Sequence, residues 1–246
     1  MHLRSFVFVF AALALATAAF GQPGAIPAPQ NPGVLIDAYQ INYLPSPVGG
    51  GVPGGYVDIT NAGQLGADAF GPLSGTTGRI CANVYVFTAD EQESECCSCL
   101  VTPNALVHLT AADLVGNPGN GVTPTLGIVV KLLATIPGVS ATNPAGPPPG
   151  VGTNAGPFTG SFCNAAAPFA TANLAPGMRA WATKFHTNTT TSPATTSLTE
   201  TAFLPALLSQ GELTKLTGLC QFLAGNQSGA GLCKACSLGG LGGAKQ

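Results

Sequence analysis

The sequence predicts a mainly β protein, an antiparallel β-sandwich with a short helical, disulfide-rich C-terminal segment. Three observations support this fold class. Short runs of β-branched and aromatic residues are separated by turn residues, and the 246-residue chain contains 33 Gly and 21 Pro, as is typical of antiparallel sandwiches. The apolar spacing changes to three and four residues after position 205, which favours a helix. Eight cysteines follow a predicted export signal, which favours disulfides.

The composition argues against disorder and against nucleic-acid binding. Only 7% of the residues are charged, against roughly 25% in a typical soluble domain. The net charge is −2 and 46% of the residues are hydrophobic, so the chain is expected to fold. The eight basic residues are scattered and form no patch. Low net charge favours association, so the expected partners are copies of the chain itself or cell-surface components.

Residues 1–21 are predicted to be a secretory signal peptide. Arg4 supplies the positive charge, residues 6–19 the apolar stretch, and the small residues Ala19 and Gly21 the cleavage pattern before Gln22. A transmembrane helix needs ~20 apolar residues, and this run is shorter. The mature chain is therefore expected to begin near Gln22, to have no membrane span and to be secreted, at the cell surface or in the periplasm.

The mature chain divides into three predicted parts. Residues 22–55 form a Pro/Gly-rich arm with one strand at 34–44, residues 56–205 form the sandwich, and residues 206–246 form a helix and a Cys-x-x-Cys tail. The arm's strand is expected to pair within its own sheet; its alternative is donation of residues 33–44 to a neighbouring subunit.

Period-2 patterns and turn residues place the strands of the sandwich. The expected strands lie at 56–60, 82–88, 106–110, 126–136, 158–163, 179–187 and 198–203. In the strand at 179–187, Trp181, Thr183 and Phe185 face one way. Residues 137–157 are rich in Pro, Gly and Asn and are expected to form a loop.

The best helix signal begins at Ser209. Ser209 and Glu212 match a capping box, in which the serine caps the helix and the glutamate reaches back. Gly225 and Asn226 indicate the end of the helix. One apolar face is predicted from four residues at spacings of three or four, namely Leu213, Leu216, Cys220 and Leu223.

All eight cysteines are predicted to form disulfides, because an even number in an exported chain indicates pairing. They are Cys81, Cys96, Cys97, Cys99, Cys163, Cys220, Cys233 and Cys236. Eight cysteines allow 105 pairings; one bridge is expected from Cys220 to Cys233 or Cys236. The alternative is a four-thiolate zinc site, because Cys96-x-x-Cys99 and Cys233-x-x-Cys236 have its spacing. The oxidising compartment and the extra cysteines favour disulfides, so no metal and no cofactor is predicted.

No motif indicates an active site, and the protein is not expected to be an enzyme. The sequence has no nucleophile elbow, zinc-protease motif, P-loop or dinucleotide-binding loop. The acidic run at 90–95 is interpreted as a solvated loop; its alternative is a weak Ca²⁺ site. Trp181 and Tyr85 are interpreted as core residues, with stacking on sugar as the alternative. Asn188 and Asn226 begin N-glycosylation sequons.

Two segments resemble a known group of proteins. Residues 81–87, 95–99 and 102–104, together with the ending at 219–222 and 228–236, resemble uncharacterised cysteine-rich exported proteins of environmental bacteria, particularly acidobacteria. The resemblance implies secretion and a paired-cysteine framework, and it assigns no catalytic residue. In its low charge and Thr/Ala/Gly-rich composition the chain also resembles secreted filament and surface-layer subunits.

The predicted function is therefore structural. We expect an exported protein that self-associates or is displayed at the cell surface. An extracellular filament subunit or matrix subunit would fit this expectation. The second hypothesis is a secreted binding module, either an adhesin or a carbohydrate-binding domain, that uses loops such as 137–157 and 187–197. The third hypothesis is an enzyme or metal protein.

Overall fold

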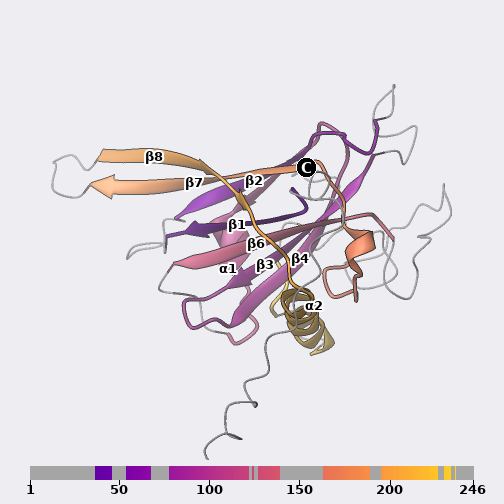
Figure 1. The fold of residues 1–246 in the computed structure, drawn as a ribbon. Coiled ribbons are helices and arrows are strands. Elements are labelled where there is room, and N and C mark those ends of the chain that lie inside the picture. The colour runs from indigo at the N-terminus through magenta and orange to yellow at the C-terminus, as the bar shows by residue number, and fades with distance from the viewer. Residues whose placement is uncertain are drawn as a thin grey trace, which may run out of the picture. The chain divides into compact units, whose positions relative to one another are not determined.

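The computed structural model describes residues 37–45, 54–67, 78–121, 124, 127–138, 163–188, 195–226, 230–233 and 236. All of them belong to one compact unit, Asn31–Gln246. The unit contains two antiparallel sheets packed face to face, so the predicted β-sandwich is confirmed (Figure 1). Within the described part of the chain, no helix is long and apolar enough to cross a membrane.

Sheet A contains five strands in the order β4-β3-β6-β1-β9, and sheet B contains four in the order β5-β2-β7-β8. The strands of sheet A are β1 (Tyr39–Leu44), β3 (Ile80–Phe87), β4 (Glu93–Val101), β6 (Ile128–Thr135) and β9 (Leu204–Pro205). Those of sheet B are β2 (Gly55–Asn61), β5 (Leu106–Thr110), β7 (Met178–Asn188) and β8 (Thr195–Ala202). The helices are α1 (Ala111–Val115), the short 3-10 helix η1 (Thr171–Asn173) and α2 (Gln210–Gly225).

The main core lies between the two sheets, and strict alternation along the strands builds it. In β2, Val57 and Ile59 are fully buried while Asp58 between them is not. Because successive side chains of a strand point to opposite faces, the strand contributes one face to the core. Val84, Leu132 and Ala182 join the same cluster from β3, β6 and β7. The alternation predicted for residues 56–60 is therefore confirmed, and that predicted for 179–187 is confirmed over the described side chains of residues 179–186.

A second cluster covers the other face of sheet A. Every residue of β3 is buried, because α2 and the segment around η1 pack on the face that points away from sheet B. Leu213 and Leu216 of α2 share this cluster with Tyr85 and Leu133 of sheet A. Sheet A is thus covered on both faces. Its central strands consequently form a nearly continuous apolar run, as in other sheets buried on both sides.

The N-terminal strand is part of its own sheet. β1 pairs antiparallel with β6 along its whole length and with β9 at Gln40 and Ile41. The Gln40 side-chain amide also donates to the Met178 carbonyl at 2.8 Å, which links the two sheets. Donation of residues 33–44 to a neighbour is therefore wrong for Tyr39–Leu44. The strand also begins later than predicted, because residues 37–38 form a turn, while 34–36 lie outside the described residues.

The acidic run is not a solvated loop throughout. Asp90 and Glu91 lie exposed in the turn between β3 and β4, but Glu93 and Glu95 belong to β4 and are buried. The sequence pattern missed β4 because Glu, Ser and Cys dominate it and β propensity is weak for such residues. Pairing with β3 and the disulfides described below override that local preference.

Helix α2 begins at the predicted cap and ends at the predicted stop. The Ser209 hydroxyl accepts from the Glu212 backbone N–H at 3.0 Å, and Asn226 is the C-terminal cap. Glu212 does not complete the capping box, because its carboxylate contacts Lys131 of β6. The complete capping box belongs to α1, which was not predicted, where Thr110 and Asp113 exchange hydrogen bonds.

Several predictions concern residues outside the described part of the chain. These are the signal peptide at 1–21, residues 139–157 of the predicted loop and residues 158–162 of a predicted strand. Cys163, the last residue of that predicted strand, lies outside any strand. The predicted strand at 126–136 is confirmed as β6, with slightly shorter bounds.

Candidate functional site

The eight cysteines form four disulfides, as predicted. The pairs are Cys81–Cys163, Cys96–Cys220, Cys97–Cys233 and Cys99–Cys236. The expected bridge from Cys220 to the tail is wrong. Both α2 and the tail contact β4, and each is bonded to that strand instead of to the other. All four cysteines of the two Cys-x-x-Cys pairs are disulfide-bonded, so they are not thiolates and cannot form a four-thiolate zinc site.

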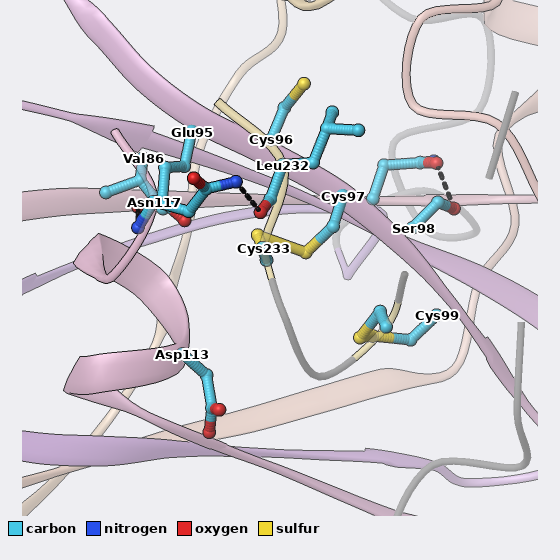
Figure 2. The surroundings of a disulfide bond; sticks show 12 residues. Val86, Glu95, Cys96, Cys97, Ser98, Cys99, Asp113, Asn117, Leu232 and Cys233 are labelled. Atoms are coloured by element: carbon cyan, nitrogen blue, oxygen red, sulfur yellow. Dashed lines mark hydrogen bonds between the residues drawn. A yellow bond between two sulfur atoms is a disulfide. The ribbon is translucent and has the colours of Figure 1, made fainter. Parts of the chain in front are cut away.

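Three consecutive bridges leave β4 in two directions. Cys97 and Cys99 point into the core between the sheets, whereas Cys96 points to the opposite face, where α2 lies. Figure 2 shows the sulfur of Cys96 on the other side of the strand from Cys97 and its partner Cys233. This arrangement follows from the alternation of side chains along a strand, which lets adjacent cysteines bond to different segments.

The C-terminal segment closes the free edge of β4. The backbone N–H of Cys96 donates to the Gly231 carbonyl at 2.8 Å, and that of Cys233 donates to the Cys96 carbonyl at 3.2 Å. Asn117, which follows α1, donates from its backbone N–H to the Glu95 carboxylate at 2.7 Å and from its side chain to the Leu232 carbonyl at 3.4 Å (Figure 2). The outer edge of β4 is therefore paired around Cys96, and disulfides hold the C-terminal segment beside it.

A polar cluster lies between sheet A and α2. Its ionisable members are Glu93, Lys131, Glu212 and Lys215. Lys131 donates to Glu212 at 2.5 Å, and its ammonium lies 4.3 Å from the centre of the Phe87 ring. In a chain with 18 charged residues among 246, four in one cluster is a marked concentration.

Glu93 is the most perturbed carboxyl of this cluster. Its side chain is buried, and neither carboxyl oxygen has a hydrogen-bond partner among the described residues. The pKa of Glu93 is raised to about 9, chiefly by burial and in addition by the nearby Glu212, while Lys131 and Lys215 oppose the shift. Glu93 is therefore protonated at neutral pH, which avoids the large free energy of burying an unpaired charge.

The same region contains the only set of metal-ligand types found among the described residues, Glu93 with Cys96 and Cys220. The two sulfur atoms are bonded to each other, so they are not thiolates and the set has only one ordinary ligand. The buried Tyr85 next to it has a pKa well above its usual range, first because of burial and then because of Glu93. Burial thus favours the protonated forms of both Glu93 and Tyr85.

Trp181 is not a core residue, contrary to the sequence interpretation, whereas Tyr85 is fully buried as predicted. Trp181 lies half-buried on the outer face of sheet B, because its neighbours Ala180 and Ala182 are the residues that point inward. The alternation along β7 was predicted, but the sequence does not show which of its two faces is covered.

The remaining candidate residues lie apart from one another. His108 is exposed in β5 and its Nδ1 lies 2.7 Å from a carboxylate oxygen of Asp58, while His186 is exposed in β7. Among the described residues, no hydroxyl or thiol is hydrogen-bonded to the His108 ring. Asn188 ends β7 and Asn226 caps α2; their use as glycosylation sites stays a prediction.

Comparison with known proteins found no matching family model, no matching curated protein and no matching solved structure.

Proposed function

We propose that the protein is an exported structural subunit that self-associates through the free edge of β8. Four disulfides fit a protein that matures in an oxidising compartment. A chain with so few charges has little electrostatic repulsion to keep copies apart. The observation that carries the proposal is the long unpaired edge of β8, in contrast to β4, whose outer edge is paired with the C-terminal segment at Cys96.

The open edge is long and weakly protected. β8 has eight residues and pairs with β7 on one side; within the described ranges no strand pairs with its other side. Natural edge strands are usually short or carry Lys, Pro or bulges that prevent pairing. β8 has only one charged residue, Glu200, and exposes 61% of Leu198. The Asn42 side chain contacts the edge only at its end, at the carbonyls of residues 201 and 202.

The register of β8 against β7 determines which backbone N–H and C=O groups of β8 point away from β7. Phe203, which directly follows β8, donates its backbone N–H to the Ala180 carbonyl at 2.9 Å. Because backbone groups alternate in direction along an antiparallel pair, those of Thr196, Leu198 and Glu200 point to the open edge. Two copies paired antiparallel about Leu198 would place Leu198 against Leu198 and Glu200 against Thr196, with no like charges opposed. Such a contact is isologous and produces a dimer.

Sedimentation velocity over a wide concentration range tests this proposal on the exported, oxidised protein. The wild type is expected to shift from monomer to dimer as concentration rises. Leu198→Lys should remain monomeric, because the substitution places two positive charges face to face. Leu207→Lys is the matched control, since Leu207 is 89% exposed but lies between β9 and α2. A wild type that stays monomeric throughout, or a Leu198→Lys variant that associates equally well, would overturn the proposal.

A further inference from the structure

The outer face of sheet B carries aromatic side chains where a solvated sheet normally carries small polar ones. Tyr56 of β2 and Trp181 and Phe185 of β7 all point away from the core, because Val57, Ala180 and Ala182 next to them point inward. The three aromatic residues are each half-buried. Among the described residues no element covers this face, in contrast to the covered outer face of sheet A. Exposed clusters of this kind mark interaction sites.

Ring contacts hold Tyr56 and Phe185 in place. The Tyr56 ring lies 4.6 Å from the His108 ring and 6.0 Å from the Phe185 ring, centre to centre. His108 is itself fixed by its contact with Asp58 at 2.7 Å. In the register of the sheet, Asp58 lies opposite both His108 and Trp181. The face is therefore a preorganised surface of flat rings with a carboxylate between them, which lowers the entropy lost on binding.

One hydroxyl on this face lacks a partner. Thr183 lies on the outer face, opposite Tyr56 and between Trp181 and Phe185 along β7. It is 3% exposed, and its Oγ1 has no hydrogen-bond partner within the described ranges. A buried polar group without a partner destabilises the protein, because its desolvation is not compensated by a hydrogen bond. A ligand hydroxyl seated between the rings would supply the missing hydrogen bond.

The charges of the face select the ligand class. Asp58 is paired with His108, and Arg179 on the same face forms an ion pair with Asp37. The remaining charge is the carboxylate of Glu200, which lies opposite Thr183. No basic group is left to bind phosphate, sulfate or uronate, so the complementary ligand is uncharged. It must present apolar C–H surfaces to the rings, whose faces are negative, and hydroxyls to the carboxylate and to Thr183.

We propose that the outer face of sheet B, defined by Tyr56, Trp181 and Phe185 with Asp58 and Thr183, binds a neutral polysaccharide. Sugar rings stack on the aromatic side chains through their C–H faces, a weak contact that gains from repetition along a polymer. This binding site borders β8, where Glu200 lies opposite Thr183 and Leu198 lies opposite Phe185. It uses the face of the sheet and not the edge, so it does not depend on self-association. A structural subunit with such a face would attach to a glycan matrix.

The chain provides its own reporter for the test, because Trp181 is the single tryptophan. The intact exported protein is titrated with four soluble neutral polysaccharides, namely hydroxyethylcellulose, xylan, galactomannan and starch, and with polygalacturonate as the anionic comparison. At least one neutral polymer should shift the Trp181 emission to shorter wavelength in a saturable manner. Polygalacturonate should bind at least tenfold more weakly than that polymer.

Variants separate this site from unspecific contact. Phe185→Ala and Tyr56→Ala should each weaken binding at least fivefold while the tryptophan reporter is retained. Phe222→Ala is the matched control, since Phe222 is 67% exposed on α2, and it should bind like the wild type. Trp181→Ala is tested by gel retardation in the same polymers and should lose retardation. Near-UV circular dichroism of Phe185→Ala shows whether this variant keeps its fold. Asp58→Asn keeps the shape of the side chain and removes its charge, so it tests separately whether the carboxylate contributes to polysaccharide binding.

Three results would overturn the proposal. One is the absence of a saturable response with all four neutral polymers. Another is equal binding of polygalacturonate, which would indicate an anion site. The third is binding that survives Phe185→Ala, Tyr56→Ala and Trp181→Ala alike. Each of these outcomes leaves the dimer interface at β8 to its own test, because Leu198→Lys is read out by sedimentation.

Discussion

Glu93 shows how a carboxyl group can be buried in a chain that otherwise avoids charge. Its position in β4 directs the side chain toward the cluster beneath α2, where Lys131 already binds Glu212 at 2.5 Å. The lysine is thus committed to another carboxylate, and Glu93 has no hydrogen bond of its own among the described residues. Protonation removes the charge, so the folded state keeps this residue as a neutral acid.

This proton should make stability depend on pH in a defined window. The pKa of Glu93 is about 9 in the folded protein against an ordinary value of 4.5. Between these values the native state binds one more proton than the unfolded state, so the stability from this group is full below pH 4.5 and is lost as pH rises toward 9. The wild type should lose stability relative to Glu93→Gln by up to about 1.4 kcal/mol per pH unit in that window.

Denaturant unfolding from pH 5 to 9 measures this difference. Glu200→Gln makes the same chemical change at an exposed position of β8 and should run parallel to the wild type. A difference between Glu93→Gln and the wild type that stays constant with pH would contradict the assignment of a neutral Glu93.

At the residue scale, the sequence predicted that the cysteines form disulfides, but it did not predict which residues around them are buried. That all eight would pair follows from export and an even number. The burial of Glu93 and Glu95 could not be predicted, because four acids within six positions are usually solvated and only the fold shows which two of them enter a strand. The interpretation of Trp181 as a core residue was wrong for a related reason. Alternation divides a strand into two faces, but which face is covered depends on segments distant in sequence.

Among the elements, β4 carries the greatest constraint. It pairs with β3 on one side, contacts residues 231–233 on the other and forms three of the four disulfides. The bridges do not contribute equally, because a disulfide stabilises chiefly by the loop it closes in the unfolded chain. When Cys97–Cys233 is intact, it already holds β4 beside the C-terminal segment in the unfolded chain. Cys96–Cys220 and Cys99–Cys236 then each close only a short additional loop.

The disulfides should therefore rank by effective loop length. Removal of Cys81–Cys163, which spans 82 residues, should lower the free energy of unfolding by about 4.5 kcal/mol on the chain-entropy relation. With Cys97–Cys233 present, Cys96–Cys220 closes about 15 residues and should contribute about 3 kcal/mol, and Cys99–Cys236 closes about 7 and should contribute about 2 kcal/mol.

Guanidinium unfolding of the three paired Cys→Ala variants gives the order. Each variant removes two buried sulfur atoms and replaces them with the same side chain, so the comparison among the three is matched. A larger loss for Cys99–Cys236 than for Cys81–Cys163 would contradict the loop account and indicate that strain or packing governs the bridges.

The elements that were predicted well are those with local signals. β2, β7 and α2 show clear period-2 or helical spacing, and Ser209 and Asn226 mark the ends of α2. α1 was missed although Thr110 and Asp113 carried a capping signal, because the helix has only five residues. β4 had no local strand signal, because its place in the sheet depends on disulfides to residues more than 100 positions away in the sequence.

Considered as a whole, the described unit is asymmetric in two respects. Sheet A is covered on both faces, and disulfides at β4 attach α2 and the C-terminal segment to it. Among the described residues, no element covers the aromatic face of sheet B and no strand pairs with the outer edge of β8. The β7–β8 hairpin extends past the last β2 partner, because β7 pairs with β2 only up to Lys184 (Figure 1). Sheet A, which carries the disulfides of β4, thus packs against sheet B, whose outer face and β8 edge are the surfaces proposed to make contacts.

The fold class could be predicted at this scale, but the strand order could not. Composition, turn residues and strand spacing indicate a sandwich without specifying which strands are neighbours. Pairing of β1 with β6 and of β2 with β7 joins segments about 90 and 120 residues apart, and no local pattern specifies contacts of such range. The open edge, on which the proposed function depends, is therefore a property of the folded chain alone.

Hydrogen exchange of the segment 195–202 at low and high protein concentration tests the central claim most directly. The amides of Leu198 and Glu200 point to the open edge and should exchange freely in dilute protein. They should become protected in concentrated protein, while the same segment of Leu198→Lys stays unprotected at both concentrations. Equal exchange of the wild-type segment at both concentrations, in samples whose sedimentation shows dimer, would place the interface elsewhere and contradict assembly through β8.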